Sequence, residues 1–187
     1  MNGRGRATNQ RRSIRLRGHD YSQPGAYFVT ICTLDGRSLL WETAVGQSGL
    51  SPCGKIALQC WENIPKHFPL LSLDAYVVMP NHVHGILMIS ECEPSSPSGG
   101  EISPRLSFSG SRRGSIAAIV GAYKSAVSRQ TRGLPCAETG GFWQRGYYER
   151  IIRDEAELGR VREYIANNPI SWADDPENPL SGKGGMG

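Results

Sequence analysis

A chain of 187 residues is long enough for one well-packed domain and too short for two ordinary ones. Hydrophobic residues make up 39% of it, and no apolar run approaches the roughly 18 residues of a membrane span, so we expect no membrane partner. The formal net charge of +4 is a property of the first 18 residues, which hold six arginines and no acidic residue. Charge therefore permits a nucleic-acid partner without requiring one.

The basic N-terminus, residues 1–20, is typical of a flexible arm and has no apolar block behind it. It lacks the form of a secretory signal, and we expect a cytoplasmic protein. Two interpretations of its arginines stay open: contact with DNA phosphates, or solvation without a partner. The arginines concerned are Arg11, Arg12, Arg15 and Arg17. The five cysteines are odd in number and lack CxxC spacing, so we expect reduced thiols rather than disulfides or a zinc site.

The first half of the chain alternates strand and helix signals. Residues 26–33 (AYFVTICT) are β-branched and aromatic with partial alternation, which predicts a strand. Residues 51–64 open with Ser-Pro and carry apolar residues at helical spacing, which predicts a helix that Pro65 ends. Residues 73–79 predict a second strand, and the apolar run at residues 84–89 continues as a third.

The second half begins with residues 91–113, where Ser, Gly and Pro supply 13 of 23 positions and predict a flexible loop. Apolar residues recur on one helical face over residues 116–127, and residues 142–152 are extended and aromatic in character. A last helix is expected over residues 154–168, and a disordered tail over residues 174–187. The order β, α, β, β, α, β, α indicates an α+β fold, one sheet with helices packed on it.

His82 and His84 stand two residues apart where one predicted strand becomes the next. Such residues point to the same face of an extended segment, so both imidazoles can converge on one metal ion while Val83 turns into the core. Gly85, directly after the pair, suggests that the backbone of a ligand comes close. The competing interpretation is two ordinary polar residues at a strand edge.

The last predicted helix carries Tyr164 and Asn168 one turn apart. Leu158, Val161 and Ile165 form its apolar seam, and both polar residues lie on one flank of that seam. The phenol and the amide can therefore reach a shared point above the sheet, where the amide oxygen would complete a His, His, Asn ligand set. The competing interpretation has the tyrosine packing beside the seam and the asparagine ending the helix.

Three blocks of sequence carry a family resemblance. The runs YVVMPNHVHGILMI, FWQRGYYERIIRDE and REYIANNPISW together resemble the REP-associated tyrosine transposases, in the single-tyrosine branch of the His-hydrophobic-His (HUH) endonucleases. These are related to small insertion-sequence transposases. The strand AYFVTICT and the helix GAYKSAVSRQ also fit, so the resemblance covers roughly residues 20–173 as one domain.

The resemblance implies a role for each matching residue. His82 and His84 match the metal-binding histidines, Tyr164 matches the nucleophile, and Asn168 matches a polar ligand one turn further on. The implied metal is Mg²⁺ or Mn²⁺, and the implied fold is a ferredoxin-like or RRM-like α/β sandwich with a central antiparallel sheet. The implied activity cuts single-stranded or hairpin DNA, leaving a 5′-phosphotyrosine and a free 3′-hydroxyl.

Several alternatives stay open on the sequence alone. A non-catalytic RRM-like nucleic-acid-binding module derived from a transposase is the alternative function. Insertion-sequence transposases work as dimers and REP-associated ones can be monomeric, so a homodimer is one of two expected states. Arg145 either contacts DNA or belongs to a solvated face, and Tyr147 and Tyr148 either pack in the core or stack on DNA bases.

Overall fold

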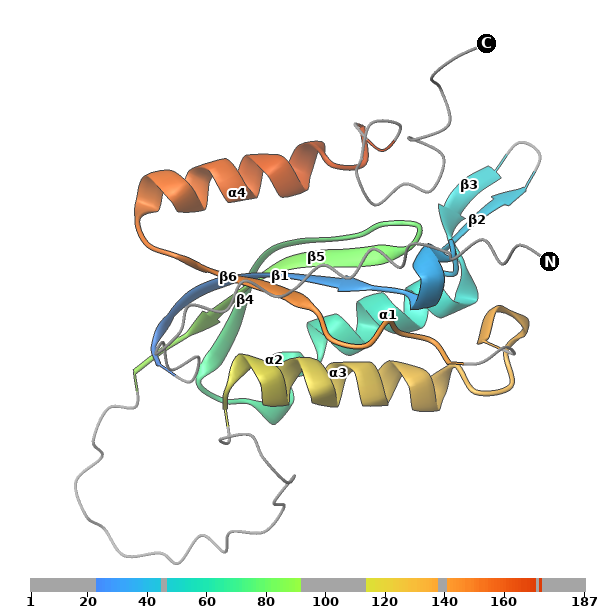
Figure 1. Cartoon of the computed structure of the whole chain (residues 1–187), viewed down its shortest axis with the longest axis horizontal. Coiled ribbons are helices and arrows are strands. Elements are labelled where there is room, and N and C mark those ends of the chain that lie inside the picture. Colours follow the sequence, from blue (N-terminus) through green and yellow to red (C-terminus); the bar gives the residue numbers. More distant parts are fainter. Residues whose placement is uncertain (1–22, 45–46, 92–113, 138–140, 171, 173–187) are drawn as a thin grey trace, which may run out of the picture.

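Figure 1 shows the computed structural model of the chain, which describes residues 23–44, 47–91, 114–137, 141–170 and 172. Its centre is an antiparallel sheet of four strands in the order β4-β5-β1-β6. The strands are β1 (Gly25–Cys32), β4 (Leu71–Val78), β5 (His82–Ile89) and β6 (Tyr148–Ile152). The predicted α+β class with a central antiparallel sheet is confirmed.

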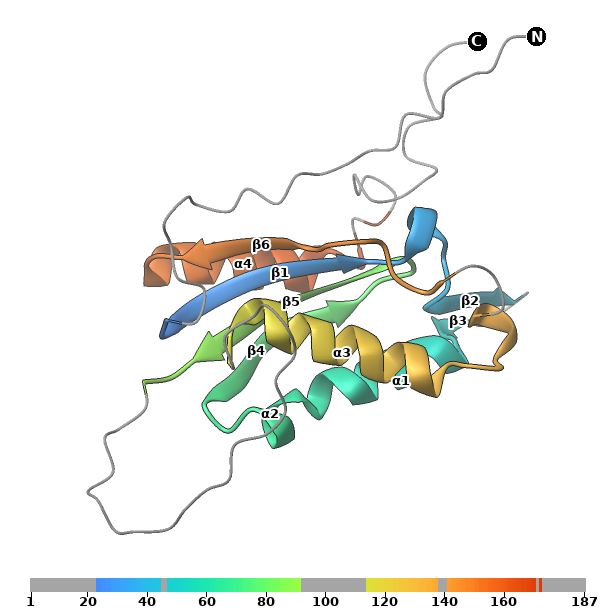
Figure 2. The same ribbon diagram turned by 60° about the horizontal axis from the view of Figure 1, so that its bottom comes forward.

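Helices cover both faces of this sheet. On one face lies α4 (Glu155–Asn167), and on the other lie α1 (Pro52–Glu62) and α3 (Ile116–Gln130). The short α2 (Ile64–His67) follows α1. The second view, in Figure 2, shows the same three layers from another side. The histidine strand β5 is an inner strand of the sheet. Because helices cover both faces of the sheet, the two faces of β5 lie toward different helices.

The sheet separates two apolar cores. Tyr27, Val29 and Ile31 of β1 are fully buried in the larger core, which α1 and α3 cover. Phe28 lies on the opposite face and belongs with Ile86 to the smaller core, which α4 covers. Successive strand residues point to opposite faces, so this division extends to every second residue of β5.

Two predicted element boundaries are wrong. Pro65 does not end the first helix: α1 ends before it, and Pro65 lies in the first turn of α2, where its missing N–H removes no helical hydrogen bond. The extended run predicted for residues 142–152 forms a regular strand only over β6. The preceding loop is held instead by Lys124 of α3, whose ammonium donates to the carbonyl oxygens of Gln144 and Gly146.

Besides the main sheet, the structure has two short 3-10 turns and a small hairpin, and the sequence patterns did not predict the hairpin. The hairpin pairs β2 (Trp41–Ala44) with β3 (Gln47–Leu50) apart from the main sheet, and its strands are too short to show a clear alternation. Trp41 ties the hairpin to the sheet, because its indole N–H donates to the carbonyl of Val78 at 2.9 Å. The 3-10 turns are η1 (Leu34–Gly36) and η2 (Pro135–Ala137).

The prediction that the cysteines are all reduced is wrong for two of them. Cys53 at the start of α1 and Cys136 in η2 form a disulfide, with Cα atoms 6.6 Å apart. The two residues are 83 positions apart in sequence and meet because α1 packs against α3, which η2 follows. The positions of the two cysteines along the chain do not predict such a contact. Cys60 stays a thiol, and burial raises its pKa.

Three predicted segments lie outside the described residues, so their descriptions stay predictions. They are the arm at 1–20, the loop at 91–113 beyond its first residue, and the tail at 174–187. The single domain predicted between arm and tail is likewise described only in part. Among the described residues, no helix has the length and apolar character needed to cross a bilayer.

Gly85 of β5 makes room for a side chain of the apolar core and not for a ligand. A Cβ atom added to it would lie 2.2 Å from Cζ2 of Trp61, a fully buried indole of α1. Gly85 therefore faces the larger core, on the side of the sheet away from His84. The expectation that its missing side chain admits the backbone of a ligand is wrong, because the indole fills that space.

Replacing Gly85 by alanine is expected to destabilise the protein by about 1–3 kcal/mol, because a rigid buried ring must move to admit the methyl group. Gly121→Ala in α3 is the matched control. Nothing lies within 4 Å of a Cβ atom at Gly121, so this change should stabilise by up to about 1 kcal/mol. Urea unfolding of the three proteins measures both effects, and equal stability of Gly85→Ala and wild type contradicts the packing argument.

Candidate active site

The two histidines lie side by side on the sheet face that α4 covers. His82 begins β5, and His84 stands opposite Thr30 of β1 in the strand register. Their ring centroids are 4.3 Å apart, and the side chains are 0% and 3% exposed. Val83 between them is buried in the opposite core, as predicted. The pair is thus a buried imidazole cluster on an inner strand and not a solvated strand edge.

Local capping and an apolar seam place α4 over this face. The carboxylate of Asp154 caps the helix by accepting a hydrogen bond from the backbone N–H of Glu157 at 2.7 Å. The predicted seam is confirmed, because its residues form one core with apolar side chains of the sheet. That core consists of Phe28, Ile86, Ile152, Leu158, Val161 and Ile165.

An ion pair adds a third attachment of α4, this time to β4. The guanidinium of Arg162 donates to both carboxylate oxygens of Asp74, at 2.9 and 2.8 Å. The same guanidinium donates to Glu155 at 3.2 Å. Asp74 lies where the β4–β5 register shifts, so the irregular strand presents its carboxylate to the helix. These attachments fix the helix that carries Tyr164.

Tyr164 meets the histidine pair directly. Its phenolic oxygen lies 3.3 Å from Nε2 of His84, and the two ring centroids are 5.3 Å apart. Phe28 packs against both rings, with centroids 6.0 Å from that of Tyr164 and 5.3 Å from that of His84. The tyrosine side chain is nevertheless 45% exposed. A phenol that contacts a buried imidazole and still faces solvent is accessible to a large substrate.

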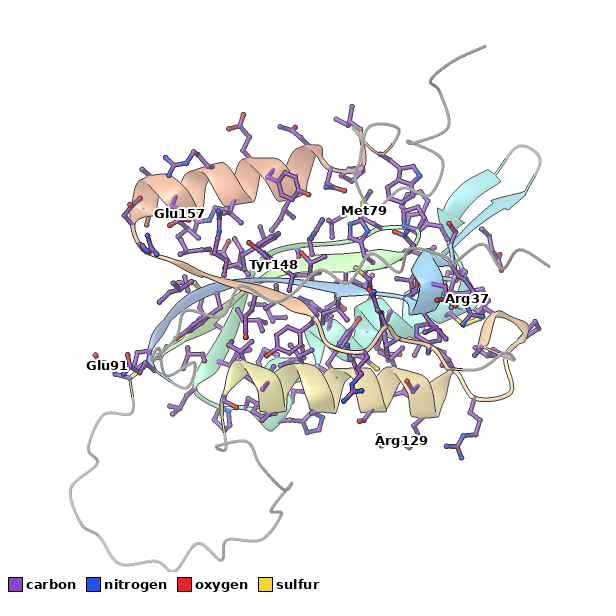
Figure 3. The ribbon with its side chains drawn as sticks, in the orientation of Figure 1. Arg37, Met79, Glu91, Arg129, Tyr148 and Glu157 are labelled. Atoms are coloured by element: carbon purple, nitrogen blue, oxygen red, sulfur yellow. A yellow bond between two sulfur atoms is a disulfide. The ribbon has the colours of Figure 1, made fainter. Side chains whose placement is uncertain are left out.

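Asn168 and Trp172 lie at the C-terminal end of α4. Asn168 is 3% exposed, and its Oδ1 atom is fully buried, as is Nε2 of His82. The indole of Trp172 lies with its centroid 5.9 Å from that of His82. The side chains that fill the space between α4 and the sheet are drawn in Figure 3, where Met79 is labelled near this end of the helix. Burial fits the predicted ligand role of Asn168, which stays a prediction.

The other ring nitrogen of each histidine meets a buried polar side chain. Nδ1 of His84 lies 2.9 Å from Oγ1 of Thr30, and Nδ1 of His82 lies 2.8 Å from Oδ1 of Asn81. Thr30 and Asn81 are 4% and 1% exposed. Neither residue was predicted from the sequence, although Asn81 immediately precedes the histidine pair in the run NHVH. These contacts leave Nε2 as the nitrogen through which each imidazole would bind a metal.

The donor set fits a divalent ion completed by oxygen ligands. Within the described ranges, no three His, Cys, Asp or Glu side chains gather closely enough to hold a metal by themselves. His82 and His84 supply two nitrogen donors, and Asn168 would supply an amide oxygen, so water or phosphate oxygens must fill the remaining positions. Two imidazoles favour Mn²⁺ over Mg²⁺, because Mg²⁺ is bound mainly through oxygen.

Asp74 makes the anchoring of α4 depend on pH. The hydrogen bond from Arg162 lowers the pKa of the Asp74 carboxyl below its ordinary value. A carboxyl with a lowered pKa stabilises the fold above its unfolded pKa of about 3.9, and this contribution is lost as the pH falls through the folded value. We therefore expect Arg162→Met to be less stable than wild type at neutral pH, with the difference shrinking in acid.

Urea unfolding of both proteins at neutral pH and at about pH 2.5 checks this sign. Arg160→Met is the matched control, since Arg160 is another exposed arginine of α4, whereas the ion pair with Asp74 is made by Arg162. A stability difference between Arg162→Met and wild type that is equally large at both pH values contradicts the assignment. A control variant that behaves like Arg162→Met also contradicts it.

Of the predicted DNA-contacting arginines, the structure describes Arg145 alone, and it lies away from the histidine pair. Arg11, Arg12, Arg15 and Arg17 lie outside the described residues. Arg145 is exposed in the loop before β6 and lines a shallow pocket with Lys124 and Trp143, on the α3 side of the molecule. Burial of Lys124 lowers its pKa to about 8. Tyr147 and Tyr148 are half-buried, and Tyr123 is buried in the larger core.

Comparison with known proteins agrees with this architecture. No model of a known protein family matches the chain. The chain is 39% identical over 172 residues to an uncharacterized protein of Haemophilus influenzae, and the match covers 89% of this chain and 92% of that protein. The chain belongs to the family of that protein.

Among solved structures, members of the same fold include a REP-associated tyrosine transposase bound to a REP hairpin. The TM-score to this structure is 0.55 at 16% sequence identity, with 87% of this chain and 81% of that chain covered. At this identity the likeness establishes the fold alone. The fold that the sequence resemblance implied is therefore confirmed, and the roles of the individual residues stay predictions.

Proposed function

We propose that the protein is a metal-dependent endonuclease and strand transferase of the transposase type, which cuts single-stranded DNA with Tyr164 as nucleophile. The observation that carries the proposal is the 3.3 Å separation between the phenolic oxygen of Tyr164 and Nε2 of His84. It joins a solvent-accessible nucleophile to a buried pair of metal-ligand side chains. The fold shared with a REP-associated tyrosine transposase supports the same reaction class.

The proposed step exchanges one phosphodiester bond for another. The phenolic oxygen of Tyr164 attacks the phosphorus in line, a tyrosine–phosphate bond forms, and the bond from phosphorus to the 3′ oxygen breaks. The phenol loses one proton and the departing 3′ oxygen gains one, which leaves a 5′-phosphotyrosine and a free 3′-hydroxyl. Because the phosphodiester is retained on the protein, a 3′-hydroxyl can later reverse the exchange without an external energy source.

Each neighbouring side chain has a definite part in this step. His82, His84 and Asn168 would hold the divalent ion. When bound, that ion supplies positive charge that stabilises the negative charge developing on the phosphate oxygens. Phe28 packs on Tyr164 and on His84, which limits the phenol to directions near the imidazole. The attachment of α4 through Arg162 keeps this geometry while the substrate enters from solvent.

Single-stranded or hairpin DNA is the substrate class that we propose. A phenol near the surface of a helix can reach a phosphate in an extended strand, whereas the buried histidines cannot leave the sheet. The structural neighbour is bound to a REP hairpin, which is consistent with such a partner. Arg145 and the arginines of the N-terminal arm are proposed as phosphate contacts that add affinity without sequence readout.

A covalent-adduct assay tests this proposal. Wild-type protein is incubated with labelled single-stranded and hairpin oligonucleotides, with Mn²⁺ or with EDTA, and separated under denaturing conditions. We expect a labelled protein band that requires Mn²⁺, accompanied by a released fragment with a 3′-hydroxyl. DNA binding without any adduct on either substrate supports instead the non-catalytic RRM-like binding module.

A further inference from the structure

We propose that Asn81 and Thr30 are positioning residues that hold the two imidazoles with the proton on Nδ1, so that Nε2 of each carries the lone pair at the site. For His82 the inference rests on the proposed function only in its consequence, which is metal affinity, because hydrogen bonds of this chain fix its tautomer. For His84 the tautomer rests on the proposed metal ligation through Nε2. Asn81 contacts His82, and Thr30 contacts His84, each through Nδ1.

The backbone of Asn81 is locked to the turn that follows β1. Its carbonyl oxygen accepts two hydrogen bonds from Thr33, one from the backbone N–H at 2.8 Å and one from the hydroxyl at 3.0 Å. Thr33 is fully buried and Asn81 is 1% exposed. Two bonds from one residue leave the asparagine little rotational freedom, so its side chain has a defined direction.

The amide of Asn81 has a defined orientation as well. Its Nδ2 group donates to the carbonyl oxygen of Gly36 at 3.1 Å. An amide nitrogen only donates and a carbonyl oxygen only accepts, so the opposite atom, Oδ1, must face His82. Turning the amide over would bring two acceptor oxygens together in a buried place, at a cost of about 1–3 kcal/mol for each unsatisfied group.

The orientation of that amide decides the tautomer of His82. Oδ1 of Asn81 accepts hydrogen bonds and cannot donate one, and it lies 2.8 Å from Nδ1 of His82. Nδ1 must therefore carry the proton, and in the neutral ring the lone pair falls on Nε2. A metal binds imidazole through that lone pair. The carbonyl of Gly36 orients the amide of Asn81, and this amide in turn holds His82 in the tautomer that can bind a metal.

The turn that supplies this carbonyl has an unusual backbone. Asp35 and Gly36 have φ angles of 55° and 66°, both in the left-handed region. Such a conformation aims the carbonyl of Gly36 at the amide of Asn81, 45 residues away in sequence.

Thr30 has the corresponding place at His84. Its Oγ1 atom lies 2.9 Å from Nδ1, across the β1–β5 pair, and is 4% exposed. The hydroxyls of Thr30 and Tyr164, which lie near the two ring nitrogens of His84, can each donate or accept. Metal ligation through Nε2 selects the arrangement in which Nδ1 donates to Thr30. The Thr30 hydroxyl then accepts that hydrogen bond and keeps the ring plane directed at the site.

Nitrogen-15 NMR of the imidazole rings, recorded on the full chain without metal or DNA, tests the tautomer first. The spectra of His19→Gln, His67→Gln and His84→Ala identify three of the four rings, and the remaining ring is that of His82. We expect the neutral ring of His82 to be protonated on Nδ1. Protonation of its Nε2, or a mixture of both tautomers, overturns the inference. This measurement does not depend on DNA cleavage, so the tautomer of His82 is tested separately from the nuclease proposal.

Mn²⁺ affinity, measured by calorimetry, tests the consequence. Asn81→Leu and Thr30→Val remove the hydrogen-bonding groups at similar size and should each weaken Mn²⁺ binding by about 10–100-fold. Thr30→Ser keeps the hydroxyl and should stay within about threefold of wild type. Asn81→Asp keeps the acceptor that faces His82 but sets an acceptor against the carbonyl of Gly36, so its affinity should lie between those of wild type and Asn81→Leu. Equal affinity in all four variants overturns the positioning role, and so does equal loss in all four. If wild type binds no Mn²⁺, the nuclease proposal fails while the NMR result still decides the tautomer.

Discussion

Tyr164→Phe is expected to abolish the covalent DNA adduct and to lower cleavage by at least about 10⁴-fold, the scale on which removal of a nucleophile acts. The phenolic oxygen is the atom that would bond to phosphorus, and phenylalanine retains everything except that oxygen. The side chain is 45% exposed, so the loss of its hydroxyl should change the free energy of unfolding by less than about 0.5 kcal/mol. Denaturing gels measure the adduct, and urea unfolding measures stability.

The control for this substitution is a phenol on the other side of the sheet. Tyr76 donates its hydroxyl to Glu62 and packs near Trp61 in the larger core. Tyr76→Phe should cleave DNA at the wild-type rate. Binding of the uncut oligonucleotide should be similar in all three proteins. Cleavage by Tyr164→Phe at a rate near wild type would show that another group is the nucleophile.

His84→Ala is the second change with a large expected effect. It removes a proposed metal ligand, and it also removes the ring that Tyr164 and Thr30 contact. We expect Mn²⁺ affinity to fall by more than about 100-fold and the adduct to disappear. The ring is buried and stacked on Phe28, so the cavity should also cost about 1–3 kcal/mol of stability.

His67→Ala separates these effects from the general loss of a histidine. His67 is the last residue of α2 and is exposed to solvent, whereas the histidine pair on β5 is buried. This variant should bind Mn²⁺ and form the adduct as wild type does. Calorimetry with Mn²⁺ is compared at a temperature at which all variants remain folded. Undiminished Mn²⁺ affinity in His84→Ala would exclude the histidine pair as the metal site.

Most of the main sheet and its helices were predictable because their signals are local. The strand over residues 26–33 and the last helix, with its cap at Asp154 and its seam, depend on the identity of near neighbours. The hairpin of β2 and β3 was missed because four-residue strands show too little alternation. The disulfide between Cys53 and Cys136 was missed because it depends on how α1 meets α3.

The candidate site divides in the same way. A strand period of two residues places His82 and His84 on one face, and a helical turn places Asn168 beside Tyr164; both follow from sequence spacing. The spacing of residues along the chain does not predict that α4 covers the face of the sheet with the histidines and not the opposite face. The family resemblance implied that arrangement, and the contact between Tyr164 and His84 is what the structure adds.

Local sequence predicts which side chains share a face within each element, because backbone periodicity acts between neighbours a few positions apart. Which of these faces contact each other depends on long-range packing, and the fold shows it. Phe28 and the seam of α4 bury apolar area together, and this packing brings the phenol to the imidazole. The hydrogen bond from Asn81 to Gly36 likewise joins residues 45 positions apart, and burial gives such long-range contacts their specificity because unpaired polar groups are costly there.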